Sequence, residues 1–411
     1  MKKSIILTLI LILAMGLPSA VTAAEDIQIS LLYPLTGGLA ESGKRMVAAY
    51  EVAAEMINGS YDIPLPYAKT EGIPNLGGAK IKLKFYDTQG SPEIGKAETE
   101  RILQDGKAKL IIGAYQSGVT KPTSFVAERH KFPYLCAESS SAALTERGLK
   151  YFFRLAVTDK VDSFGFMDFL DAQKQAGKKV DRIAMVYEKT EFGVHAAKEI
   201  KSRIKERKGY DLVADVPHVY NSTDVNAEVM KIKAAKPDVI IHATLITDMM
   251  LFAKTYKNLG VQANANISFC GGYHNPVFAK MGSDAEGYAG GCTFAPDFIQ
   301  VKPHLKAVND MFKAKSGIDM DGITMEGFTA LFVAADAFNR AKSTDPEAVT
   351  KALRTTDLEI HTLPGNRIKF DENGQNIGTS SAISQIQRSA YKVVYPPDLS
   401  TAPVQWPMGQ K

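Results

Sequence analysis

Short apolar runs alternate with longer amphipathic stretches along the chain from Ile27 onward. Several of the runs, such as KLIIGAY at 109–115 and DVIIHATLI at 238–246, are apolar almost throughout and do not alternate with polar residues. Strands with this pattern are typical of parallel sheets that helices cover on both faces. Seven strands are predicted on this basis, at IQISLLY, KIKLKFYD, KLIIGAY, FPYLC, DRIAMVYE, DVIIHATLI and NISFCGG. The alternation therefore predicts an α/β protein with open sheets.

The helices predicted between these strands fall into two successive units, at about 27–157 and 159–287. The helix predicted at 41–58 carries an apolar stripe made of Met46, Ala49, Tyr50, Ala53 and Ile57. Beyond residue 291 the pattern is mainly helical, and strand-like RIKFD and YKVVYP follow near the end. A length of 411 residues also favours two domains over one. The segment 59–78, rich in Gly and Pro, is predicted to be a surface loop.

The first 24 residues read as a signal peptide. MKK is a basic start, SIILTLILILAMGL an apolar centre, and PSAVTAA a small-residue cleavage region that predicts a mature chain from Glu25. A membrane anchor is the alternative, but the apolar run is short for a span and ends in a processing site. No cysteine lies at that site, so nothing indicates lipid attachment. Export to a soluble compartment, the periplasm, is expected.

The sequence lacks the features that mark several classes of function. The formal net charge of +4 is too small to indicate a nucleic-acid partner. GLAESGKR at 38–45 resembles a P-loop, but Arg45 stands where a Mg²⁺-binding hydroxyl is needed. No HExxH, GxSxG or GxGxxG occurs, and the histidines form no ligand-spaced pair, so no catalytic residue, metal or cofactor is expected. A hydrolase assembled from distant residues remains an alternative.

The three cysteines do not form a disulfide scaffold. They allow at most one intrachain disulfide, such as Cys270–Cys292, and buried free thiols are the alternative. No CxxC spacing indicates a zinc site.

Two successive strand exits are rich in hydroxyls and small residues. They are GAYQSGVT at 113–120 and CAESSSAALT at 136–145, and each leads into a predicted helix. Free N–H groups at a helix N-terminus, together with hydroxyls, favour a bound anion. Simple capping of the following helix is the alternative explanation for the serines.

Four segments, which include most of the two strand exits, resemble a known family. IQISLLYPLTGGLAESGKRMVAAYEVAAEMIN, KLIIGAYQSGVTKPTSFVAERHKFPYL, ESSSAALT and PDVIIHA are similar to the leucine/isoleucine/valine-binding proteins, which are type I periplasmic solute-binding proteins of ABC transporters. The resemblance spans about 25–395. It implies two doubly wound parallel-sheet lobes joined by three crossovers, with the ligand cleft between them. The expected lobes are 25–157 plus 291–370, and 158–290 plus 371–411. A small-molecule ligand and an inner-membrane ABC permease are the expected partners of a monomer.

The resemblance also implies a set of ligand-binding residues. In this family the two strand exits bind the carboxylate of the ligand. Phe192 and Tyr273 match aromatic positions of the second lobe, and Ser42 matches a position on the cleft rim, although core packing is an equal alternative for each. The positions expected at the strand exits are Tyr115, Gln116, Ser117, Ser139, Ser140 and Ser141.

One departure from the family pattern concerns the ligand. Amino-acid binders of the family place an acidic residue after the strand that corresponds to NISFCGG, where it pairs with the ammonium group. Here the segment reads CGGYHNP and has no carboxylate, although Glu138, Asp248 or Glu326 could substitute from elsewhere. A branched-chain or other hydrophobic amino acid therefore competes with an aromatic carboxylate or an amide. A ligand-sensing module for a receptor is a further alternative.

Overall fold

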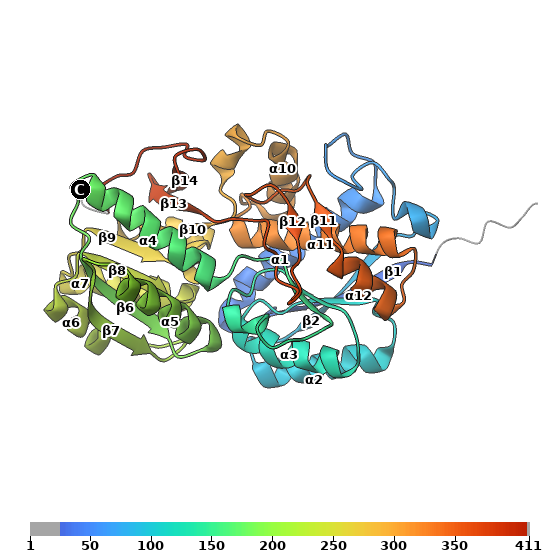
Figure 1. The fold of residues 1–411 in the computed structure, drawn as a ribbon, viewed down its shortest axis with the longest axis horizontal. Helices are drawn as coiled ribbons and strands as arrows, with labels where there is room; N and C mark the ends of the chain where they lie inside the picture. Colours follow the sequence, from blue (N-terminus) through green and yellow to red (C-terminus); the bar gives the residue numbers. More distant parts are fainter. Residues whose placement is uncertain (1–24, 409–411) are drawn as a thin grey trace, which may run out of the picture.

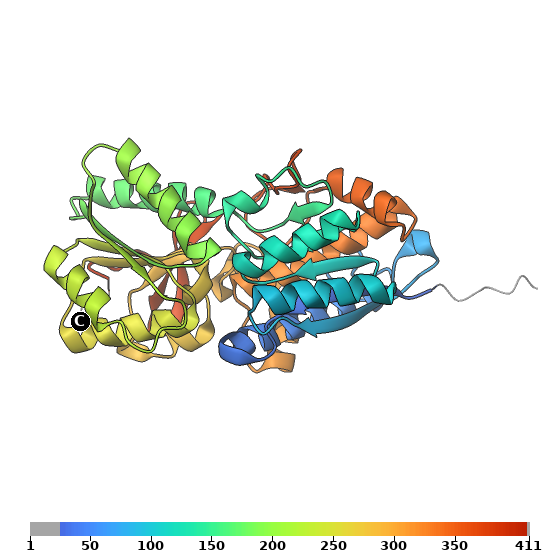
Figure 2. The same ribbon diagram turned by 90° about the horizontal axis from the view of Figure 1, so that it is seen from below.

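The computed structural model describes residues 25–408, and the predicted signal peptide, residues 1–24, lies outside them. Two sheets form two lobes that lie side by side along the long axis of the molecule (Figures 1 and 2). Within residues 25–408, no helix combines the length and the apolar character needed to cross a bilayer.

The first sheet has five strands in the order β2-β1-β3-β4-β5, and all neighbouring pairs are parallel. Its strands are β1 (Ile27–Tyr33), β2 (Ile81–Asp87), β3 (Leu110–Gly113), β4 (Tyr134–Cys136) and β5 (Phe152–Arg154). The helices of this lobe are α1 (Ala40–Asn58), α2 (Pro92–Asp105), α3 (Ser117–Arg129), α10 (Leu305–Ser316), α11 (Gly322–Ala341) and α12 (Pro346–Arg354). A two-stranded ribbon of β11 (Asp357–Leu358) and β12 (Ile368–Lys369) lies beside them.

The second sheet has seven strands in the order β14-β13-β10-β9-β8-β6-β7. Its strands are β6 (Arg182–Glu188), β7 (Asp211–His218), β8 (Val239–Ala243), β9 (Ala265–Ser268), β10 (Ala289–Cys292), β13 (Ala382–Gln387) and β14 (Ala390–Tyr395). The pairs from β10 to β7 are parallel, whereas β13 and β14 join antiparallel. The helices are α4 (Asp159–Gln175), α5 (Glu191–Glu206), α6 (Asn226–Ala235), α7 (Ile246–Leu259), α8 (Cys270–Tyr273) and α9 (Pro276–Ala279).

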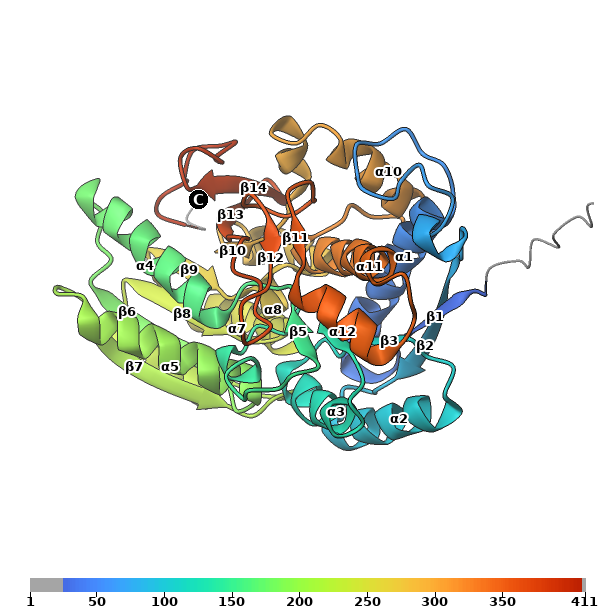
Figure 3. The same ribbon diagram turned by 45° about the vertical axis from the view of Figure 1, so that its right-hand side comes forward.

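The chain passes between the lobes three times: after β5, after β10, and on the way to β13 (Figure 3). On the third pass, residues 374–376 lie against β5, because Arg154 donates its N–H to the Gly374 carbonyl at 2.8 Å and Asn376 donates to the Arg154 carbonyl at 2.9 Å. This segment follows the expected boundary at residue 371 and still packs against the first sheet. The α/β fold with two lobes and three crossovers agrees with the prediction.

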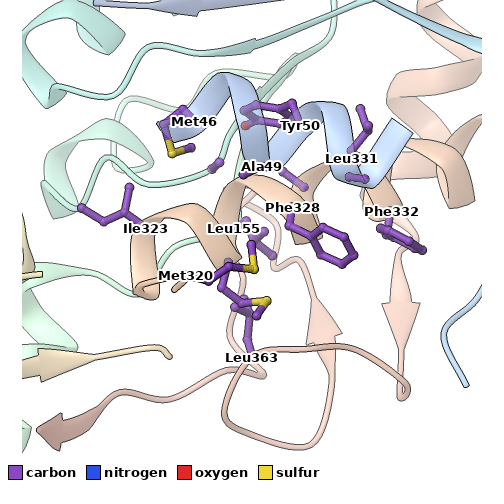
Figure 4. Packing of buried hydrophobic residues seen from close by; sticks show 14 of the residues in the cluster. Met46, Ala49, Tyr50, Leu155, Met320, Ile323, Phe328, Leu331, Phe332 and Leu363 are labelled. Carbon is purple, nitrogen blue, oxygen red and sulfur yellow. The ribbon is translucent and has the colours of Figure 1, made fainter. Parts of the chain in front are cut away.

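The core of the first lobe forms where α1 packs against α11 (Figure 4). All five residues of the predicted α1 stripe are completely buried, which confirms that prediction. Figure 4 shows Met46, Ala49 and Tyr50 on the side of α1 that lies against α11, where Phe328 and Leu331 are also completely buried. Because α11 is apolar on nearly every face, it is covered on all sides, as expected for a central helix.

The segment 59–78 is more than a surface loop. Ile63, Leu65, Ala68 and Ile73 are buried in the core of the first lobe, and the Tyr67 hydroxyl donates to Asp336 Oδ1 of α11 at 3.0 Å. Its Gly and Pro residues therefore shape a loop that packs its few apolar side chains inward. Elsewhere, Cys136 and Cys292 are buried free thiols, so Cys292 takes part in no disulfide.

Candidate ligand-binding site

A cavity of about 320 Å³ lies between the two lobes. Its walls come from the carboxyl ends of parallel strands, which is where open α/β sheets bind ligands. The first lobe contributes the exits of β3 and β4, and the second lobe contributes those of β6 and β8. Of the predicted site residues, six line it: Tyr115, Gln116, Ser117, Ser139, Ser140 and Phe192.

The exit of β3 turns sharply into α3. At Gly113 φ is +150°, and a Cβ at this position would lie 2.5 Å from the Leu32 carbonyl oxygen, so only glycine fits. Tyr115 has φ +72°, a left-handed conformation that is uncommon for a tyrosine and that clusters at functional sites. Helix α3 then begins at Ser117, and its first N–H groups have no acceptor within the helix. Ser117 and Gly118 present this helix start to the cavity.

The hydroxyl groups at the two exits have different roles. Ser139 Oγ donates to the Tyr115 carbonyl at 2.9 Å and lies 2.7 Å from Thr120 Oγ1, so it holds the exits together. Ser117 Oγ accepts from the Ser141 N–H at 3.3 Å, which leaves its own hydrogen available to a ligand. Ser141 is completely buried outside the cavity lining and makes no side-chain cap to the short helix at 142–144.

A buried guanidinium supports the second exit. Arg154 is completely buried, and its Nη1 donates to the carbonyl oxygens of Ser139, at 3.2 Å, and Ser141. Its Nε donates to Gln375 Oε1 at 2.6 Å, and Gln375 lies on the third crossover. Burial lowers the pKa of Arg154 to about 10, so the group remains charged at neutral pH. The guanidinium therefore donates to the carbonyl groups on one side of the loop, and the other side of the loop faces the cavity.

The second lobe closes the cavity with an aromatic wall. Phe192 lies at the start of α5, where Thr190 Oγ1 caps the helix by accepting from the Gly193 N–H at 3.3 Å. A Cβ at Gly271 would lie 3.1 Å from the Phe192 ring, so this glycine leaves room for the aromatic side chain. Tyr220 and Leu245 complete the wall.

Besides Ser141, two predicted residues lie outside the lining of this cavity. The prediction that Tyr273 faces the cleft is wrong: β9 ends at Ser268, and Tyr273 lies on α8, completely buried, with its hydroxyl 3.1 Å from Ser384 Oγ of β13. Ser42 is buried on α1 and lines a separate cavity of about 460 Å³, where it accepts from Asn275 Nδ2 at 3.3 Å.

Two of the three acidic residues considered from the sequence line the main cavity. Tyr33 donates its hydroxyl to Glu138 Oε2 at 3.2 Å, whereas Glu138 Oε1 is buried without a partner among the described residues. Burial raises the pKa of Glu138 to about 8, and it also raises the pKa of Glu326, which is 4% exposed, well above its usual value. Asp248 instead accepts the N–H groups of Asn221 and Ser222 at 2.8 Å, away from the cavity lining.

Comparison with known proteins shows to which family the chain belongs. A sequence model of the periplasmic binding protein family matches residues 26–390. The chain belongs to this family. Leu/Ile/Val-binding protein homolog 7 of Brucella abortus is 27% identical over 399 residues, which cover 94% of this chain and 96% of that protein. The leucine-, isoleucine-, valine-, threonine-, and alanine-binding protein of Pseudomonas aeruginosa is 27% identical over 362 residues, covering 87% and 89%.

Solved structures of periplasmic binding proteins share the fold. The branched-chain amino acid transporter substrate binding protein of Streptococcus pneumoniae, in complex with isoleucine, has a TM-score of 0.77 at 18% identity, covering 90% of this chain and all of that one. A solute binding protein of an ABC transporter from Rhodopseudomonas palustris, in complex with 3,4-dihydroxy benzoic acid, has a TM-score of 0.76 at 17% identity, covering 90% and 96%. The family and the fold are those of substrate-binding proteins.

Sequence reasoning did not identify Glu188 of this periplasmic binding protein as a cavity residue. Its carboxylate accepts from Thr190 Oγ1 at 2.7 Å and from the Leu245 N–H at 3.0 Å, and burial raises its pKa to about 7. The position at the carboxyl end of a predicted strand was a usable signal for Glu188. No comparable signal marks Tyr220 or Ile323, which also line the cavity.

Polar contacts bridge the lobes of the binding protein at two places. Lys121 Nζ of α3 lies 2.9 Å from Glu191 Oε2 of α5, next to the cavity. Asn275 Nδ2, before α9, donates to Glu41 Oε2 of α1 at 2.9 Å. Both pairs join a residue of one lobe to a residue of the other, so separation of the lobes would break them.

Proposed function

We propose that the chain is the solute-binding component of an ABC importer and is not an enzyme. It captures a small carboxylate-bearing solute, a branched-chain or other hydrophobic amino acid, between its lobes in the periplasm and delivers it to an inner-membrane permease. The observation that carries the proposal is the convergence of two donor-rich strand exits on one cavity, which Ser117 and Ser140 line together with Phe192 of the other lobe.

The chemistry of the cavity suits such a solute. The N-terminus of α3 and the Ser117 hydroxyl offer hydrogen-bond donors and a favourable dipole to a carboxylate. Val119, Phe192, Leu245 and Ile323 offer apolar surface to a hydrocarbon side chain. A volume of about 320 Å³ falls within the range of small-molecule sites.

An aromatic carboxylate is the second candidate ligand. No carboxylate occurs between 270 and 275, where amino-acid binders of the family place one. The related structure from Rhodopseudomonas palustris binds 3,4-dihydroxy benzoic acid on the same fold. Phe192, Tyr115 and Tyr220 line the cavity and offer aromatic surface to such a ring.

A thermal-shift screen with amino acids and aromatic acids tests the proposal. A ligand present at ~100 times its dissociation constant stabilises the folded protein by about 2.7 kcal/mol, which raises the melting temperature measurably. Calorimetry with the best compound should then show saturable heat and no product. Turnover of the compound would favour the hydrolase alternative. If no compound of the panel raised the melting temperature, the proposal would be contradicted.

A further inference from the structure

We propose that Asp248 is a positioning residue of the ligand site, which fixes the loop at 219–223 so that Tyr220 closes one side of the main cavity. The main cavity is the one of about 320 Å³ between the lobes, and Tyr220 is the residue of this loop that lines it. The inference rests on the proposed function and deepens it, because it gives a buried acid outside the cavity lining a role in holding the ligand.

The carboxyl group of Asp248 holds the loop through two successive backbone N–H groups. Asp248 is completely buried near the start of α7, where its Oδ2 accepts from the Asn221 N–H and its Oδ1 from the Ser222 N–H, both at 2.8 Å. These two N–H groups belong to the planar peptide units on either side of Asn221. One side chain therefore fixes the direction of the backbone immediately after Tyr220.

The residue before Tyr220 is held in the same network. His218, at the end of β7, is 1% exposed, and its Nδ1 lies 2.9 Å from the Val219 carbonyl oxygen and 3.8 Å from Asp248 Oδ2. The Ser222 hydroxyl donates to the same Val219 carbonyl at 2.6 Å. The backbone on both sides of Tyr220 is thus tied to β7 and α7 by hydrogen bonds.

Packing contributes little to the position of this loop. Val219 is 64% exposed, and Asn221 and Thr223 are exposed as well. Cavities lie on two sides of the loop, because Tyr220 lines the main one while Ser222 and Thr223 line the second one, of about 460 Å³. A segment with few buried apolar contacts depends on its hydrogen bonds for a fixed conformation. The bonds to Asp248 therefore matter more here than they would inside a packed core.

The position of Tyr220 connects the loop to the other lobe. Its hydroxyl lies close to the side chain of Gln116, which belongs to the β3 exit of the first lobe and also lines the main cavity. The ring thus extends from a second-lobe loop to a first-lobe element beside the ligand site. If the loop lost its bonds to Asp248, a bound solute would lose this wall of the cavity and the shielding from water that it gives.

Calorimetry on variants tests whether Asp248 acts through Tyr220. The probes are L-leucine, L-phenylalanine and benzoate, and the variants are compared with the probe that binds the wild type most tightly. Asp248→Asn puts an amide NH2 in place of one accepting oxygen. It should lower the affinity of the wild type about tenfold and that of Tyr220→Ala less than about twofold. Urea denaturation should show an equal loss of stability in both backgrounds, so a merely structural role would not produce the difference in affinity.

Fluorine NMR tests the position of Tyr220 without any ligand. In protein labelled with 3-fluorotyrosine, the resonance of Tyr220 is the one that is missing from Tyr220→Phe. Asp248→Asn should shift or broaden this resonance. Asp224→Asn is the matched control, because Asp224 lies next to the same loop, is exposed, and accepts from the Asn226 N–H at 2.8 Å. The control should leave both the resonance and the affinity unchanged.

The outcomes separate the inference from the proposed function. An unchanged Tyr220 resonance in Asp248→Asn, or an equal loss of affinity in both backgrounds, would overturn the inference and leave the proposed function intact. If none of the three probes binds the wild type, that result counts against the proposed function, and the fluorine spectrum alone decides the inference. If Asp248→Asn does not fold, Asp248→Ser takes its place, and its shorter side chain should change the resonance and the affinity in the same direction.

Discussion

Removal of one hydroxyl group tests the assignment of the β3 exit. In Ser117→Ala the first residue of α3 keeps its backbone N–H and its place in the cavity wall, and loses only Oγ. Among residues 25–408 this oxygen has one hydrogen-bond partner, the Ser141 N–H at 3.3 Å. The loss of a ligand contact would therefore lower the affinity, whereas the loss of the one long internal contact would lower the free energy of unfolding.

The expected sizes of the two effects differ. A hydrogen bond to a charged group contributes roughly 1.5–3 kcal/mol, so the affinity for a carboxylate should fall about tenfold to a hundredfold. The internal contact is long and neutral, so the free energy of unfolding without ligand should fall by about 1 kcal/mol or less. A purely structural serine would show the reverse ranking, with loss of stability and little loss of affinity.

Both quantities can be measured on the same protein samples. Calorimetry with L-leucine gives the affinity, and urea denaturation without ligand gives the free energy of unfolding. L-leucinamide, which lacks the carboxylate, should bind the wild type far more weakly than L-leucine, and Ser117→Ala should affect it less. If the amide binds the wild type as tightly as the acid, or if Ser117→Ala keeps the wild-type affinity, the carboxylate does not lie at this exit.

Three further predictions concern pH, closure and the support of the site. Folding raises the pKa of Glu138 from 4.5 to about 8, so its contribution to stability is present below about pH 4.5 and is lost as the pH rises toward 8. Between these pH values the urea midpoint of Glu138→Gln should therefore fall less than the midpoint of the wild type. Lys121→Ala removes a partly exposed ion pair worth about 0.2–1 kcal/mol, so stopped-flow measurements should show up to about fivefold faster ligand release at low salt and no difference at high salt. Arg154→Ala leaves loop carbonyls and the Gln375 side chain unpaired, so urea denaturation should show a loss of about 3 kcal/mol or more; a loss under 1 kcal/mol would contradict its supporting role.

The first-lobe half of the site could be predicted because its signals are local. Each exit joins a buried apolar run to a cluster of hydroxyls, and the carboxyl ends of parallel strands meet at one edge of a sheet. The fold itself was predictable for the same reason, from runs such as 109–115 and 238–246. Strands without such a run were missed: β5 has three residues, and β7 carries mostly exposed or half-exposed side chains at the edge of its sheet.

The second-lobe half depends on contacts that no local pattern records. The apolar run NISFCGG predicts a strand that continues to residue 272, but the strand ends at Ser268 and α8 follows. The helical turn directs Tyr273 to Ser384 of β13, a residue more than a hundred positions further along the chain. In the first lobe, likewise, the packing of α11 against α1 brings Glu326 to the cavity that Glu138 lines.

The loop at 139–141, which lines the proposed ligand site, is hydrogen-bonded directly to the segments that connect the lobes. Arg154 joins the carbonyl groups of Ser139 and Ser141 to Gln375 on the third crossover. The Ser140 carbonyl accepts from the N–H of Asp159 at 2.9 Å, at the start of α4 and immediately after the first crossover. Hinge closure moves one lobe relative to the other through such connecting segments. Any shift of the 139–141 loop on ligand binding must therefore be accommodated by the hydrogen bonds of two crossovers, which is why the supporting guanidinium belongs to the binding site as much as the hydroxyls do.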